Sequence, residues 1–73
     1  MKETLLIVIN EILEEKNGQR LDTLNEGTSL RKDLGFDSMD LALLTAKLDE
    51  ECGVDIFEDG IIDTVEEVLK KLA

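Results

Sequence analysis

Apolar residues recur in three stretches of the chain at the spacing that forms one face of an α-helix. These stretches are residues 3–16, residues 38–51 and the residues from 64 onward. Their apolar positions are Leu5, Ile9, Ile12 and Leu13; Leu41, Leu44 and Leu48; and Val65, Val68, Leu69 and Leu72. The pattern predicts three helices, each with one face turned toward a shared core.

Residue types that start and stop helices stand at the ends of these stretches. Asn17-Gly18 and Cys52-Gly53 predict C-terminal ends, because asparagine and glycine tolerate a left-handed backbone. Asp37 is expected to cap the second helix by accepting hydrogen bonds from backbone N–H groups of its first turn. Asp63 or Thr64 is expected to cap the last helix, where Thr64-Val65-Glu66-Glu67 is typical of a capping box.

Two segments lack helical periodicity. Residues 18–36 form a loop that is long for so small a domain, and residues 54–63 predict at most one helical turn. We therefore expect residues 1–73 to form a single all-α domain. The predicted architecture is a small antiparallel bundle of three main helices plus one short helix, with the long loop between the first and second helices.

The composition excludes several kinds of active site. The 73 residues include no histidine and one cysteine, Cys52. A disulfide within the chain, a Cys/His metal site and a Ser-His-Asp triad are therefore impossible. Cys52 is expected to be a small buried apolar residue. We expect no catalytic residue and no metal site, and we expect a protein that is not an enzyme.

Charge is concentrated in the second half of the chain. The formal net charge is −10, and between Asp33 and Glu67 twelve residues are acidic and one, Lys47, is basic. Such a surface repels nucleic acid and anionic lipid and attracts basic protein surfaces. The apolar run from Leu5 to Ile9 is too short, and too closely followed by acids, for a signal peptide or membrane span. We expect a cytoplasmic monomer that binds neither nucleic acid nor membrane.

The candidate functional residue is Ser38. It lies within Asp33-Leu34-Gly35-Phe36-Asp37-Ser38-Met39-Asp40, where the glycine permits a turn and Asp37 takes the capping role. Asp40 favours the same positive end of the helix. Ser38 therefore has no capping duty, so its hydroxyl can point into solvent as an attachment point.

The stretch Leu34-Gly35-Phe36-Asp37-Ser38-Met39-Asp40 resembles the phosphopantetheine attachment motif of acyl carrier proteins, which carry Asp-Ser at the start of their second helix. The resemblance covers essentially the whole chain. It implies that a phosphopantetheinyl transferase joins 4'-phosphopantetheine to Ser38. The arm would then carry acyl groups as thioesters to enzymes of fatty-acid, polyketide or related biosynthesis. Asp37 is expected to orient the site and to engage the transferase.

The same resemblance implies that the second helix docks partner enzymes with basic surfaces. The expected docking residues are Asp37, Met39, Asp40, Leu43, Ala46, Lys47, Asp49 and Glu50. Relatives tend to have a larger apolar residue near Ala46 and a small residue near Lys47. Because a cation here interrupts the acidic face, the identity of the partners stays open.

Three alternatives remain at this point. An aminoacyl or peptidyl carrier would use the same serine for a different cargo, whereas an acidic helical adaptor would leave Ser38 unmodified. A calcium loop of the EF-hand kind is the third, although Phe57 lacks a ligand oxygen and Gly53 ends the preceding helix early. The residues at ligand or turn positions of that loop are Asp55, Asp59, Gly60, Ile62, Asp63 and Glu66.

Overall fold

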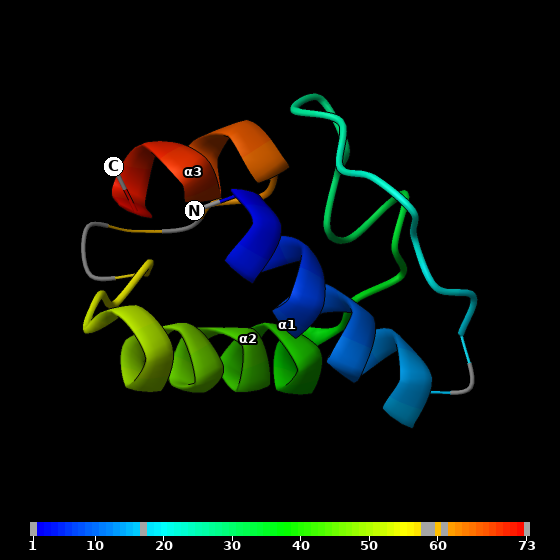
Figure 1. The fold of residues 1–73 in the computed structure, drawn as a ribbon, viewed down its shortest axis with the longest axis horizontal. Helices are drawn as coiled ribbons and strands as arrows, with labels where there is room; N and C mark the ends of the chain where they lie inside the picture. The colour runs from blue at the N-terminus through cyan, green and yellow to red at the C-terminus, as the bar shows by residue number, and fades with distance from the viewer. Residues whose placement is uncertain (1, 17, 58–59, 61, 73) are drawn as a thin grey trace.

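The computed structural model describes residues 2–16, 18–57, 60 and 62–72, and within these ranges it contains three helices: α1 (Lys2–Glu15), α2 (Ser38–Cys52) and α3 (Val65–Leu72). In Figure 1, α2 runs along the bottom of the view, α3 lies at the top, and α1 runs obliquely between them in roughly the opposite direction to α2. The predicted all-α antiparallel bundle is confirmed, with α1 and α2 within one residue of their expected bounds. No helix in the described ranges is long and apolar enough to cross a bilayer.

A single hydrophobic core joins the three helices to the segments between them. Its fully buried side chains are Leu5, Ile9, Ile12, Leu30, Leu44, Leu48, Ile56, Val65 and Val68. Each side chain of this kind contributes about 1.5–3 kcal/mol when it leaves water, and helices as short as these are marginal in isolation. The helices therefore depend on packing in this core. Cys52, which was expected to be buried, is half-buried and packs against the core.

The helix ends follow the capping residues of the sequence. Asp37 caps α2: its Oδ1 accepts from the N–H of Asp40 at 2.9 Å, and Asp40 Oδ2 accepts from the N–H of Asp37 at 3.1 Å. At the start of α3, Thr64 Oγ1 accepts from the N–H of Glu67 at 3.3 Å, and Glu67 Oε1 accepts from the N–H of Thr64 at 3.1 Å. The predicted cap at Asp37 and the predicted box at Thr64 are confirmed; the return bond from Asp40, which makes a box at α2 as well, was not predicted. Gly53 ends α2 with a left-handed φ of 70°.

The long loop between α1 and α2 is fixed by hydrogen bonds to distant parts of the chain. The side chain of Asn10 in α1 binds both backbone polar groups of Leu21. Further along, the N–H of Leu30 donates to the carbonyl oxygen of Asp63 at 2.7 Å. Since Leu30 is also buried in the core, the chain that approaches α2 has a defined path.

The predicted short fourth helix is not confirmed. Between Val54 and Asp63, the described residues contain a turn at Ile56-Phe57 and no helix, and residues 58, 59 and 61 lie outside the described part. Asp55 Oδ1 accepts a hydrogen bond from the N–H of Phe57 at 3.0 Å. This bond, from the N–H two residues on to the aspartate side chain, closes an Asx turn at Asp55 to Phe57.

Candidate functional site

Ser38 is the first residue of α2, and its side chain is exposed. Asp37 supplies the cap, so the hydroxyl of Ser38 is not needed to complete the helix end. No hydrogen bond joins this hydroxyl to any residue that the structure describes. The predicted geometry is therefore present: an accessible oxygen at the positive end of a helix dipole.

A shallow depression of about 220 Å³ lies beside Ser38. It is lined by Arg31, Leu41, Ala42 and Phe57 in addition to the serine. Arg31 and the N-terminus of α2 place positive charge at this depression, and both favour an anionic group. A phosphodiester on Ser38 is therefore compatible with the site in spite of the acidic net charge.

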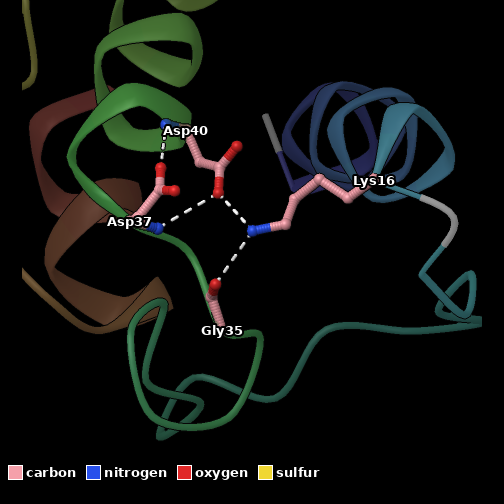
Figure 2. Close-up of polar contacts among 4 residues, drawn as sticks. All are labelled: Lys16, Gly35, Asp37 and Asp40. Atoms are coloured by element: carbon pink, nitrogen blue, oxygen red, sulfur yellow. Dashed lines mark hydrogen bonds and ion pairs between the residues drawn. The ribbon is translucent and has the colours of Figure 1, made fainter.

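The side chain of Lys16, which directly follows α1, contacts the motif around Ser38. The sequence pattern did not indicate this contact. The Nζ atom of Lys16 donates to Asp40 Oδ2 at 2.5 Å and to the carbonyl oxygen of Gly35 at 3.0 Å (Figure 2). The same Asp40 oxygen accepts from the N–H of Asp37. Lys16 and Asp40 are 24 positions apart, so no periodicity along the chain relates them.

The contact between Lys16 and Asp40 shifts the pKa of both groups. Burial raises the pKa of the Asp40 carboxyl, but hydrogen bonds from Lys16 and from the N–H of Asp37, with the charge of Lys16, outweigh it and lower this pKa. The hydrogen bond to Asp40 raises the pKa of Lys16, with a smaller opposing effect of burial. Both groups are therefore charged at neutral pH, and the ion pair is intact there.

Most of the expected docking residues lie on the solvent side of α2. Met39 is 81% exposed, and Ala46, Asp49 and Glu50 are also exposed. Leu43 is half-buried and packs against the core. Side chains three or four positions apart share one face of a helix, so this set forms a stripe of apolar and acidic groups that begins next to Ser38.

Two expected docking residues, Asp40 and Lys47, make ion pairs with the residue that follows α1 and with α1 itself. Asp40 is held by Lys16, and Lys47 Nζ lies 3.0 Å from Glu11 Oε2. The side chains of Asp40 and Lys47 are only 13% and 26% exposed. They therefore lie at the edge of the stripe, and the charge of Lys47 is partly neutralised by Glu11.

The residues of the calcium-loop alternative serve separate local contacts. The carboxylate of Asp63 accepts from the hydroxyl of Ser29 at 2.7 Å and from the N–H of Arg31 at 3.3 Å. Asp55 caps its own turn, and Asp59 lies outside the described residues. In the part of the chain that the structure describes, no three carboxylate or thiol side chains are grouped to hold a metal ion.

The sequence of the chain matches known proteins. Residues 7–72 match the family described as "Phosphopantetheine attachment site". The chain is 34% identical over 64 residues to an acyl carrier protein of Saccharopolyspora erythraea, covering 85% of this chain and 67% of the relative. It is 36% identical over 64 residues to an acyl carrier protein of Trieres chinensis, covering 85% of this chain and 80% of that relative. No solved structure matches the chain significantly.

The fold and the exposed serine thus define a phosphopantetheine-dependent carrier domain. The chain belongs to the acyl carrier protein family, whose covalent cofactor is 4'-phosphopantetheine and whose members are carriers rather than enzymes.

Proposed function

We propose that Ser38 is the attachment residue for 4'-phosphopantetheine and that the chain presents acyl groups on this arm to biosynthetic enzymes. The observation that carries the proposal is the exposed hydroxyl at the start of α2, directly after the N-cap Asp37 and without an intramolecular partner among the described residues. The attached group supplies a thiol that holds the acyl group as a thioester. Because the phosphopantetheine arm is a flexible tether, it raises the effective concentration of the cargo at a partner's active site.

Attachment forms a bond between the Ser38 oxygen and a phosphorus atom of coenzyme A, while the phosphoanhydride bond of coenzyme A breaks and the nucleotide leaves. A base must accept the hydroxyl proton. The chain has no histidine, and the carboxylates on either side of Ser38 are engaged, Asp37 in the cap and Asp40 with Lys16. We therefore assign this base to the transferase.

The solvent stripe of α2, formed by Met39, Leu43, Ala46, Asp49 and Glu50, is the proposed docking surface for the transferase and for acyl-transferring enzymes. Apolar contact at Met39 suits partners of different shape, because methionine is flexible and polarizable. Exposed carboxylates favour partners with basic surfaces and act mainly on the rate and specificity of association. Asp37, Asp40 and Lys47 belong to the edge of this surface.

Acyl cargo of the fatty-acid or polyketide type is proposed because both relatives described above are acyl carrier proteins. An aminoacyl or peptidyl cargo would use the same arm, and no contact in the described structure favours it. The cytoplasmic location and the monomeric state remain predictions.

Incubation with coenzyme A and a phosphopantetheinyl transferase of broad specificity, followed by mass spectrometry, tests the assignment. The parent protein should gain one phosphopantetheine, and Ser38→Ala should gain none. Thr23→Ala, which removes a hydroxyl from an exposed residue of the long loop, is the matched control and should be modified like the parent. Modification of Ser38→Ala would contradict the assignment, and an unmodified parent would point to an acidic adaptor.

A further inference from the structure

Lys16 contacts the attachment motif on both sides of Ser38. Its ammonium group donates one hydrogen bond to the carbonyl oxygen of Gly35, before the serine, and another to the carboxylate of Asp40, after it. Figure 2 shows this side chain reaching from the end of α1 to the turn that leads into α2. One side chain therefore fixes both ends of the short segment that contains Ser38.

The carboxylate of Asp40 connects Lys16 to the cap of α2. Its Oδ2 atom accepts from both Lys16 and the N–H of Asp37, and Asp37 in turn accepts from the N–H of Asp40. Hydrogen bonds between charged groups are roughly twice as strong as neutral ones. Because Lys16 holds the oxygen that receives the N–H of Asp37, its loss would loosen the residue directly before Ser38.

The ion pair between Lys16 and Asp40 is less exposed than the pair between Arg20 and Glu14. Its side chains are 33% and 13% exposed, whereas those of Arg20 and Glu14 are 68% and 52% exposed. Fully exposed pairs are screened by water and salt and fix little geometry. A partly covered cation with two acceptors has a defined position, and so do the groups that accept from it.

We propose that Lys16 is a positioning residue of the attachment site, which holds Gly35 and Asp40 so that the backbone around Ser38 has the conformation that the transferase binds. The inference rests on the proposed function of Ser38 and adds to it Lys16, the residue that directly follows α1. Misplacing a reacting group by about 1 Å can lower a rate by about a hundredfold. The transferase reaction should therefore be sensitive to this contact.

Charge and positioning predict opposite effects when Lys16 is replaced. Removing a cation makes the chain more acidic, and a more acidic chain should associate faster with a basic transferase. Loss of the contacts to Gly35 and Asp40 should instead slow the chemical step. The sign of the change in kcat/KM therefore distinguishes the two effects.

The test compares Lys16→Met, Lys16→Arg and Arg20→Met with the parent as substrates of the transferase and coenzyme A. Arg20→Met is the matched control, because it removes the same charge from the chain just after α1, and the ion pair of Arg20 is with Glu14 rather than with a residue of the motif. Lys16→Met should lower kcat/KM roughly tenfold, mainly through kcat. Arg20→Met should leave it unchanged or raise it, and Lys16→Arg should recover most of the loss because it restores a charged donor.

A second measurement separates positioning from loss of stability. Amide NMR shifts of Gly35 to Asp40 should change in Lys16→Met and not in Arg20→Met, under conditions where circular dichroism shows both to be folded. If Lys16→Met does not fold, Lys16→Gln, which keeps an uncharged N–H donor group, takes its place. If the parent is modified but Lys16→Met and Arg20→Met have equal kcat/KM, the role of Lys16 is overturned and the proposed function of Ser38 is not. An unmodified parent would overturn the proposed function and this role together.

Discussion

The side-chain amide of Asn10 pairs with both backbone polar groups of Leu21. Its Nδ2 donates to the carbonyl oxygen of Leu21 at 3.0 Å, and its Oδ1 accepts from the N–H of Leu21 at 2.8 Å. Asn10 is 5% exposed, so this pairing occurs largely away from water. An apolar-face position of α1 thus carries a polar residue that holds the long loop against the helix.

Asn10→Leu should lower the free energy of unfolding by about 1–3 kcal/mol, since it leaves the N–H and the carbonyl of Leu21 without partners. Urea denaturation measures this change. Asn25→Ala, at an exposed position of the same loop, is the control and should stay within about 0.5 kcal/mol of the parent. Hydrogen exchange at the Leu21 amide should accelerate in Asn10→Leu and not in Asn25→Ala. Unchanged exchange at Leu21 in Asn10→Leu would show that this pairing does not hold the loop.

Charge reversal on the docking stripe should weaken the encounter with the transferase. Glu50→Lys and Asp49→Lys replace exposed acids of α2 with bases, and should raise KM with little change in kcat, because rim charges act mainly on association. The expected rise is roughly threefold to tenfold at low salt and smaller at high salt. Glu26→Lys makes the same change of net charge on the long loop and should have a smaller effect. Equal effects at the three positions would indicate that net charge alone governs docking.

Acid should weaken the contact between the long loop and the start of α3. The hydroxyl of Ser29 donates to Asp63, and this bond, with the N–H of Arg31 and the nearby positive charges, lowers the pKa of the Asp63 carboxyl against the opposing effect of burial. A carboxyl with a lowered folded-state pKa stabilises the fold above its ordinary pKa of about 4, and the stabilisation is lost as the pH falls through the lower value.

The free energy of unfolding of the parent minus that of Asp63→Asn should therefore be constant above about pH 5 and should decrease toward pH 3. Urea denaturation at several pH values measures the difference, and the subtraction removes the titration of the other acids. In a Ser29→Ala background the same difference should depend less on pH, because the largest cause of the lowered pKa is gone. An increase toward low pH would contradict this account.

The local features of the fold could be predicted from the sequence because they depend on residues that are close along the chain. The helices follow from apolar spacing, and the cap at Asp37 and the box at Thr64 join residues within one helical turn. For the same reason Ser38 was expected, and is found, exposed at the start of α2 with the capping role taken by its neighbour. The short helix predicted in residues 54–63 is not confirmed: the described residues there contain a turn at Ile56-Phe57, and residues 58, 59 and 61 lie outside the described part.

Contacts between distant residues were decided only by the tertiary structure. Lys16 and Asp40 are 24 positions apart, and Ser29 and Asp63 are 34 apart, so no spacing rule connects them. The sequence by itself determined the helices, their caps, the acidic charge and the motif around Ser38. Packing of α1 against α2 decided that Asp40 and Lys47 face α1 rather than solvent, and that Lys16 reaches the motif. The physical reason is that a charged side chain finds its partner only after the core has brought the two helices together.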